Sequence, residues 1–136
     1  MKGAWIAVVA AALHRPDGRW LMHRRPEGKH HAGLWEFPGG KVEPAETPSA
    51  ALVRELAEEL GIGCAPEHCV PAGFAESRGA SEAAGLVILL YTVPVWQGAP
   101  RALEGGAVDW FTPEEVLALP KPPLDIALAA QLFGNR

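Results

Sequence analysis

Residues 47–61 constrain the fold most, because they carry every signal of one short amphipathic helix. Thr47 is a good N-cap, and Pro48 suits the first helical position, where its missing N–H costs nothing. Gly61 suits the position just past the helix end. The sequence therefore predicts a helix over 48–60. One side of this helix is an apolar stripe expected to pack into a core, formed by Leu52, Val53, Leu56 and Leu60.

A different side of the same helix carries three carboxylates within about one turn: Glu55, Glu58 and Glu59. Like charges three and four residues apart repel by roughly 0.2–0.5 kcal/mol per pair, and acids near a helix C-terminus oppose the helix dipole. A sequence selected only to fold would place lysines there. Local rules broken without a compensating partner indicate function, and the simplest missing partner is a divalent cation.

The composition is that of a globular protein with the size of one ordinary domain. The chain has 136 residues, of which 49% are hydrophobic, so it can bury a real core and is not disordered. We expect one domain spanning residues 1–136. The net charge of −4 gives no electrostatic basis for binding polymeric nucleic acid. A single nucleotide stays compatible with that charge, because metal ions neutralise phosphates locally.

The cellular setting is predicted from cysteines and apolar runs. Cys64 and Cys69 are too few for a disulfide scaffold and predict thiols in a reducing cytoplasm. Lys2 and the apolar run 4–13 resemble a short signal peptide, but the turn at 14–19 and the strand-like run 20–25 favour a β-hairpin, which we prefer. No apolar run reaches the roughly 18 residues needed to span a bilayer, so we expect no membrane partner.

The rest of the chain mixes strands and helices irregularly, with more strands than helices. This pattern predicts an α+β or mixed α/β fold in which helices cover a sheet. The expected segments are an extended piece at 34–37, a turn at Gly39-Gly40, strands at 69–76, 86–95 and 107–111, a short helix at 113–118 and a last helix at 124–133.

The stretch from Gly40 to Ile62 has a characteristic spacing of glycine, acids and arginine. Gly40 is followed after five residues by Glu46 and, after seven more, by Arg54-Glu55-Leu56-x-Glu58-Glu59-x-Gly61-Ile62. This matches the Nudix box at every defined position, and the preceding run, residues 35–43, resembles that of MutT-type enzymes. The length and the order of elements are also similar. The resemblance implies the Nudix α/β/α sandwich with a mixed β-sheet flanked by helices.

The resemblance also implies Mg²⁺-dependent hydrolysis of a nucleoside diphosphate linked to another group, with Mn²⁺ as an alternative ion. In the MutT branch the products are a nucleoside monophosphate and pyrophosphate. By resemblance Glu55, Glu58 and Glu59 ligate the metal, and Gly39 offers its carbonyl oxygen. Carboxylates suit this role, because Mg²⁺ prefers hard oxygen ligands, polarises phosphorus and lowers the pKa of the attacking water.

Two residues have two interpretations each: the acid that acts as general base for the attacking water, and the arginine of the box, Arg54. Either Glu55 or a downstream acid takes the proton from water. Glu104 is the candidate for that acid and for a further metal ligand, because it lies in the Gly/Pro-rich connection where MutT-like proteins carry one. Arg54 either contacts phosphate or anchors the box by pairing with acids such as Glu46 or Glu55. We favour anchoring, since a paired charge is weak evidence for catalysis.

On the substrate side the resemblance implies four further contacts. Arg25 contacts the phosphate or sugar, or is a solvated strand end; the two interpretations have equal weight. His30 lies in the loop where MutT-like proteins contact the nucleotide. Phe37 borders the base pocket or packs in the core. Gly40 permits close approach of the ligand.

Two departures from MutT proteins bear on the base. Asp125 stands where proteins selective for oxidised guanine have asparagine, and a carboxylate cannot donate a hydrogen bond unless protonated. Asp in this place also resembles relatives that act on cytidine nucleotides. The arginine expected before the long strand is replaced by residues 83–86, Ala-Ala-Gly-Leu, and Arg78 is the candidate substitute.

Three functions follow, of which we favour the first. It is a MutT-like nucleoside triphosphate pyrophosphohydrolase that clears oxidised dGTP from the nucleotide pool. The second is a pyrophosphohydrolase for CTP or modified dCTP. The third is a non-catalytic nucleotide-binding Nudix domain, which the complete set of box acids disfavours. The sequence leaves the oligomeric state open between a monomer and a homodimer.

Overall fold

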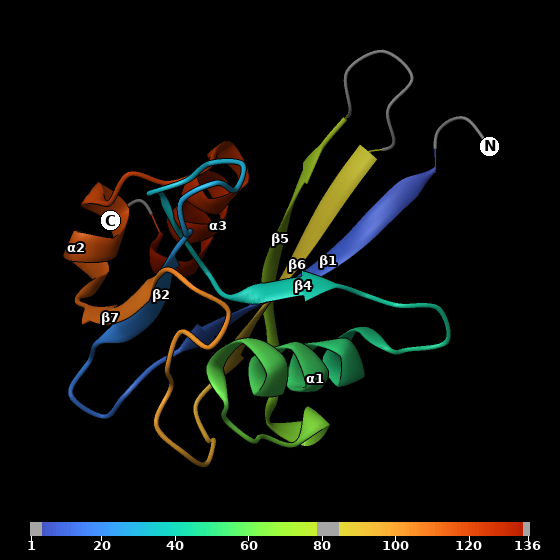
Figure 1. Ribbon diagram of the computed structural model, residues 1–136, viewed down its shortest axis with the longest axis horizontal. Coiled ribbons are helices and arrows are strands. Elements are labelled where there is room, and N and C mark those ends of the chain that lie inside the picture. The colour runs from blue at the N-terminus through green and yellow to red at the C-terminus, as the bar shows by residue number, and fades with distance from the viewer. Residues whose placement is uncertain (1–3, 79–84, 135–136) are drawn as a thin grey trace.

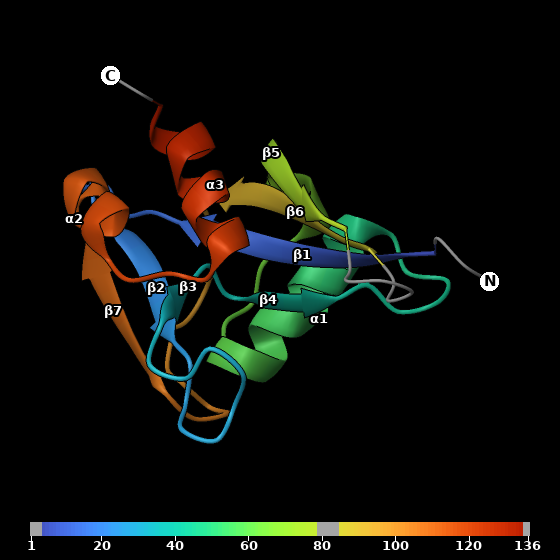
Figure 2. The same cartoon turned by 90° about the horizontal axis from the view of Figure 1, so that it is seen from above.

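The computed structural model describes residues 4–78 and 85–134, and its elements form three layers. The larger sheet has four strands. Figure 2 shows one helix on each of its faces, α1 (Pro48–Leu60) and α3 (Pro123–Phe133). Within this sheet β1 and β6 are parallel, and the other neighbouring strands are antiparallel. The strand order is β4 (Gly39–Lys41), β1 (Trp5–Leu13), β6 (Gly85–Val93) and β5 (Val70–Ser77). The predicted mixed architecture is confirmed.

A second, smaller antiparallel sheet lies beside the first (Figure 1). The short helix α2 (Pro113–Ala118) follows it in the chain, and a single 3₁₀ turn, η1 (Pro66–His68), links α1 to β5. In the part of the chain that the structure describes, no helix is both long and apolar enough to cross a membrane. The strand order of the small sheet is β3 (Trp35–Glu36), β2 (Trp20–Arg24) and β7 (Ala107–Phe111).

The second half of strand β1, residues 9–13, is buried on both faces and divides the core in two. Its alternate side chains point to opposite sides of the sheet, as in any β-strand. One set packs on the apolar stripe of α1, and the other packs on α3 and β2. Small residues on the α3 side let the helix approach the sheet closely. The α1 set is Val9, Ala11 and Leu13; the α3 set is Ala10 and Ala12.

The predicted hairpin between the first two strands is wrong. The turn at 14–19 exists, with Gly18 at φ +84° donating its N–H to the Arg15 carbonyl at 3.0 Å. Strands β1 and β2 nevertheless belong to different sheets, joined only by a bridge between His14 and Trp20. One edge of β1 is paired with β6 along its whole length, and β4 pairs with residues 8–10 on the other edge, so β2 meets β1 only just past its end.

Gly39 and Gly40 form strand β4 and not the predicted turn. They pair with Ala10 and Val9 of β1. A Cβ on Gly39 would collide with the backbone of Val9, and a Cβ on Gly40 would collide with the carboxylate of Glu55. Glycine is therefore required for close packing at these positions and not for chain reversal.

The box helix begins and ends as the sequence predicts. The Thr47 hydroxyl accepts from the Ala50 N–H at 3.2 Å, and Gly61 ends the helix at φ +71°. The start of α3 is fixed differently. The buried Lys121 ammonium donates to three carbonyls at the end of α2, and the Trp35 N–H donates to the Pro120 carbonyl at 2.8 Å. These bonds hold the α2–α3 connection against β3.

Candidate active site

Arg54 is the centre of an ion-pair network on the exposed side of α1. Its guanidinium donates to both carboxylate oxygens of Glu46 at 2.7 and 2.9 Å, and to the Lys41 carbonyl at 3.0 Å. It also bonds to Glu55 at 3.2 Å and Glu58 at 3.3 Å. This bidentate bond lowers the pKa of Glu46 to about 2. Arg54 therefore ties the start of the box to its end, which is the anchoring geometry.

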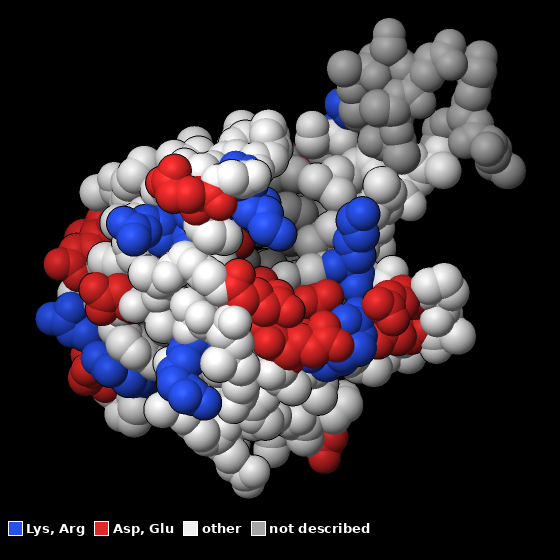
Figure 3. Space-filling view, in the orientation of Figure 1, with Lys and Arg blue, Asp and Glu red and all other residues white. Residues whose placement is uncertain are grey.

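The three box acids lie at increasing depth. Figure 3 shows acidic side chains gathered over the region of α1 and β4, beside a hollow in the surface. Glu58 is exposed, Glu55 is half-buried, and Glu59 reaches inward to accept the Gly39 N–H at 3.2 Å. Burial raises the pKa of Glu55, and it raises the pKa of Glu59 to about 7. Removal from water thus makes the inner carboxylates hold protons more tightly, unless a cation offsets their charge.

The donor set suits a hard divalent cation. It consists of carboxylate oxygens, which are the ligands that hard cations prefer. Because Gly40 has no side chain, the Glu55 carboxylate can lie directly against β4. Within residues 4–78 and 85–134, no group of three His, Cys, Asp or Glu side chains lies close enough together to hold a metal ion. The reason is visible in the bonds: Glu55 and Glu58 turn toward Arg54, and Glu59 turns toward Gly39.

Glu104 lies near the same acids, although it is distant in sequence. The preceding residue, Leu103, donates its N–H to the Glu59 carbonyl at 3.0 Å, so the connection runs along the end of α1. The charge of Glu104 contributes to the raised pKa of Glu55, after the larger effect of burial. The structure therefore places the connection that carries Glu104 near the box, and the Glu104 side chain is exposed.

A cavity of about 160 Å³ joins the box to the opposite side of the fold. Typical small-molecule pockets measure roughly 300–1,000 Å³, so this cavity is large enough for only part of such a molecule. Its apolar walls come from β1, β6 and Phe37. Its polar and glycine lining comes from five elements or their ends: Arg25, Glu36, Gly39, Gly40, Glu59 and Asp125.

Asp125 lies in the first turn of α3 with only 6% of its surface exposed. One carboxylate oxygen accepts the backbone N–H of Phe37 at 3.0 Å. Among the described residues, every fully buried side-chain nitrogen or oxygen has a hydrogen-bond partner. The other oxygen of Asp125 therefore reaches the cavity that this residue lines. Burial raises the pKa of Asp125 to about 7.

Arg25 is held at the cavity by two bonds. Its guanidinium donates to Glu36 at 3.0 Å and to the backbone carbonyl of His30 at 2.6 Å. The imidazole of His30 does not line the cavity; it is exposed and lies 3.8 Å from the ring of His31. His30 therefore meets the site through its backbone, while a nucleotide contact by its ring stays a prediction.

Two residues of this region were not singled out from the sequence. Glu36 lines the cavity and pairs with Arg25, and His23 is buried between Glu36 and the carbonyl of Gly105. The available signal was a charged or ionisable residue inside a short apolar strand. That signal is weak, because the inward or outward direction of a two-residue strand such as β3 is not readable from alternation.

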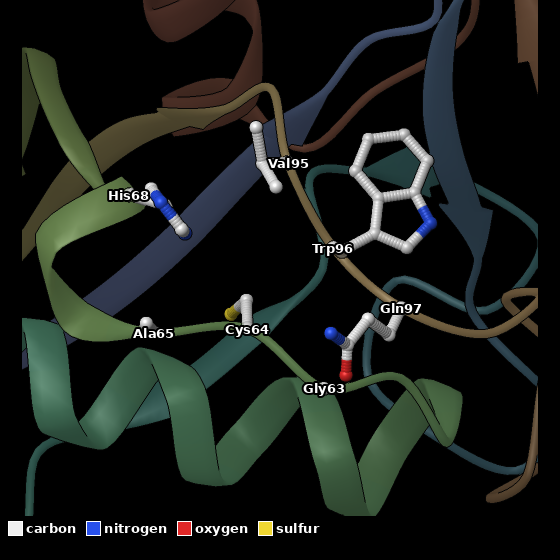
Figure 4. A pocket seen from close by; sticks show the side chains of 7 residues that line it. All are labelled: Gly63, Cys64, Ala65, His68, Val95, Trp96 and Gln97. Atoms are coloured by element: carbon white, nitrogen blue, oxygen red, sulfur yellow. The ribbon is translucent and has the colours of Figure 1, made fainter.

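Other candidate regions lie away from this cavity. Arg78, the possible substitute for the missing arginine, places its guanidinium 5.5 Å from the ring centroid of Trp5, and residues 83–84 lie outside the described residues. A larger cavity of about 320 Å³ lies beyond the end of α1, lined by Cys64, His68 and Trp96 among others (Figure 4). Burial raises the pKa of the Cys64 thiol, so it is a poor nucleophile.

The fold and the site define a class: an α/β/α sandwich with a box of acids beside a small cavity. The family model "NUDIX domain" matches residues 4–132, so the chain belongs to the Nudix family. Escherichia coli CTP pyrophosphohydrolase is 45% identical over 133 residues, 96% of this chain and 93% of that protein. Escherichia coli 8-oxo-dGTP diphosphatase is 33% identical over 132 residues, 97% and 98% of the two chains.

A solved structure agrees with these sequence relatives. The crystal structure of a MutT Nudix hydrolase from Burkholderia pseudomallei superimposes with a TM-score of 0.81 at 29% identity, covering 94% of this chain and 98% of that one. The predicted Nudix sandwich, the resemblance to MutT-like proteins and the assignment as a Nudix hydrolase are confirmed. Nudix hydrolases generally use divalent metal ions.

Proposed function

We propose that this chain is a Mg²⁺-dependent nucleoside triphosphate pyrophosphohydrolase that releases a nucleoside monophosphate and pyrophosphate. One observation carries the proposal: a single cavity joins Gly39, Gly40 and Glu59 of the box to Arg25 and Asp125. The box side suits a metal-bound phosphate chain, and the far side suits a base. We also propose that residues 1–136 form one Nudix domain, because the family model spans 4–132.

The box acids would hold the cation through their carboxylate oxygens, with Mn²⁺ as an alternative to Mg²⁺. When bound, the ion polarises the phosphorus and lowers the pKa of the attacking water. We assign Glu55, Glu58 and Glu59 to the metal, with the Gly39 carbonyl and Glu104 as further ligands. Glu55 is the better candidate for the proton acceptor, because its carboxylate lies half-buried against β4, whereas the side chain of Glu104 is exposed.

Two arginines would divide the remaining work. Arg54 is committed to Glu46, Glu55 and Glu58, so its role is to anchor the box. Arg25 lines the cavity and is held in place by Glu36, which leaves it suited to a phosphate or ribose oxygen. An arginine fixed in advance loses less side-chain entropy when the substrate binds.

The base would be recognised at Asp125. A charged carboxylate accepts hydrogen bonds, which suits the exocyclic amino group of cytosine, and a relative with 45% identity is named CTP pyrophosphohydrolase. Oxidised guanine is a second candidate, because a relative with 33% identity is named 8-oxo-dGTP diphosphatase. With a pKa of about 7, Asp125 exists in both forms near neutral pH, and its protonated form donates as an amide would.

The proposal is tested by pyrophosphate release from the purified chain with Mg²⁺. CTP, modified dCTP, 8-oxo-dGTP and the ordinary triphosphates are compared below and above about pH 7, the pKa of Asp125. We expect Mg²⁺-dependent release. We also expect the ratio of kcat/KM for CTP over 8-oxo-dGTP to rise with pH, because the carboxylate loses its donor. No release from any triphosphate, with binding retained, would favour the non-catalytic nucleotide-binding domain.

A cytoplasmic location and a role in sanitising the nucleotide pool stay predictions, as does the oligomeric state. The role in the nucleotide pool is tested once the substrate is known, because the preferred base defines which damaged nucleotide the enzyme would remove.

A further inference from the structure

His23 connects two parts of the site that are far apart in sequence. Its side chain lies on β2, inside the molecule, with 4% of the residue exposed. The Nδ1 atom lies 3.2 Å from a carboxylate oxygen of Glu36, and the Nε2 atom lies 3.0 Å from the Gly105 carbonyl oxygen. Gly105 directly follows Glu104, so one imidazole touches both the cavity wall and the connection that carries this acid.

The close approach of that connection to β2 depends on two glycines. Gly105 has φ +99° and Gly106 has φ +81°, both in the region that favours glycine. A Cβ on Gly106 would collide with the carbonyl oxygen of Arg24 and lie 3.1 Å from the Nε2 atom of His23. The glycine pair thus lets the connection run against β2, where the imidazole meets the Gly105 carbonyl.

Both partners of the imidazole are hydrogen-bond acceptors. A neutral histidine has one N–H and can satisfy only one of them, whereas the protonated ring satisfies both. Burial opposes the charge, but the bonds to Glu36 and Gly105 outweigh it and raise the pKa of His23 above its ordinary value. The charged groups that act on this ring are Glu36 on β3 and Glu59 on α1, both acidic.

Each ring nitrogen supports a different function. Through Nδ1, His23 braces Glu36, which in turn holds Arg25 at the cavity. Through Nε2, it fixes the Gly105 carbonyl and therefore the backbone next to Glu104. The first connection acts on substrate binding, and the second acts on an acid of the hydrolytic centre.

We propose that His23 is a positioning residue that couples the substrate arginine Arg25 to the Glu104 connection through these two hydrogen bonds. The proposal rests on the proposed function, because it assigns the two ends to binding and to turnover. A displacement of about 1 Å at a reacting group can cost about 100-fold in rate, so a hydrogen bond that fixes this backbone has a measurable effect.

Three substitutions separate the two bonds. His23→Asn keeps an amide donor near the Nδ1 position, facing Glu36. His23→Gln keeps a donor near the Nε2 position, facing Gly105. His23→Leu keeps the volume and removes both donors. His14→Gln is the matched control, because the His14 ring lies tilted against the Trp20 ring, with 4.5 Å between their centroids, and does not line the cavity.

We expect the asparagine variant to lose mainly kcat, by about 10- to 100-fold, with KM nearly unchanged. The glutamine variant should raise mainly KM and keep most of kcat. The leucine variant should show both losses, and the His14 variant neither. The proposal would be overturned if all three His23 variants had the same kcat and KM as the wild type. It would also be overturned if the losses of activity only paralleled the losses of thermal stability, because His23 would then merely fill the core.

A second measurement does not depend on turnover. Amide hydrogen exchange at residues 103–106 should accelerate in the asparagine and leucine variants and stay near the wild-type rate in the glutamine variant. If the wild-type chain releases no pyrophosphate, the proposed function fails, and the exchange pattern alone decides whether His23 fixes the connection. Unchanged exchange in the asparagine and leucine variants overturns the positioning role in either case.

Discussion

The two ends of the cavity are built in different ways. The proposed metal end comes mainly from one contiguous segment, residues 39–62, in which β4 and α1 pack against each other, and only Glu104 is added from a distant connection. The proposed base end is assembled from separate segments: Arg25 after β2, Phe37 after β3 and Asp125 in α3. The first is a local design that can be read along the chain, whereas the second exists only after the sheets and helices have packed.

The two ends also differ in their contact with water. At the metal end, Glu58 is exposed and Arg54 shares its charge among several acids. At the base end, Asp125 is almost fully buried and makes a single backbone bond to Phe37. An exposed site suits the entry and release of a metal ion together with its substrate. Burial strengthens each hydrogen bond and therefore suits discrimination between bases.

The largest effect is expected from a change at the metal end. Glu58→Gln should lower kcat by about 10²- to 10⁴-fold, because the charge proposed to hold the cation is lost. Thermal unfolding should stay near that of the wild type, since Glu58 is exposed. Glu114→Gln, on α2, is a matched surface control. An unchanged rate in the Glu58 variant would remove this acid from the metal site.

The next effect concerns stability at the base end. Burial raises the pKa of Asp125 from 3.8 to about 7, so folding favours the protonated acid. The stabilisation is complete below about pH 4 and is lost as the pH rises to about 7, in total roughly 4 kcal/mol. Asp125→Asn should lack this decline.

This prediction is measured by urea unfolding of both proteins across that pH range. The variant keeps a side-chain oxygen for the Phe37 N–H, so the comparison isolates the charge. Unfolding free energies that change in parallel with pH in the two proteins would show that Asp125 titrates normally.

A smaller effect distinguishes the two glycines of β4. Gly40→Ala pushes on the Glu55 carboxylate, which can move, so we expect a folded protein with kcat reduced about 100-fold. Gly39→Ala pushes on the backbone of Val9, which cannot move easily, so we expect a loss of stability. Melting temperatures and initial rates of both variants test the contrast. If the Gly40 variant keeps full activity, the close approach of Glu55 to β4 is not needed.

The smallest effect is expected on substrate ranking. Asp125→Asn should shift the ratio of kcat/KM by about tenfold from CTP toward 8-oxo-dGTP, the size of one hydrogen bond of about 1.4 kcal/mol. The reason is that an amide both donates and accepts, while the carboxylate at high pH only accepts. The ratio is measured by pyrophosphate release from each substrate separately. A ranking that stays the same would exclude Asp125 from base recognition.

Sequence reasoning succeeded where the signals are local. The cap at Thr47, the end at Gly61 and the apolar stripe of α1 depend on neighbours within a few residues, and the structure shows all three. It failed where a choice between distant partners decides the outcome. The strands 4–13 and 20–25 have hairpin signals, yet β1 takes β4 and β6 as neighbours, and β2 joins β7 and β3.

The sequence by itself determined the box: which acids share a helix face, how the helix is capped, and how far Gly40 lies from Arg54. These follow from helix geometry and chain spacing, which act over short distances. Only the tertiary structure decided the partners of the buried polar groups. Asp125 meets Phe37 across 88 residues, and His23 meets Gly105 across 82. Such contacts depend on how the sheets pack, because a buried polar atom must find its partner wherever packing places it.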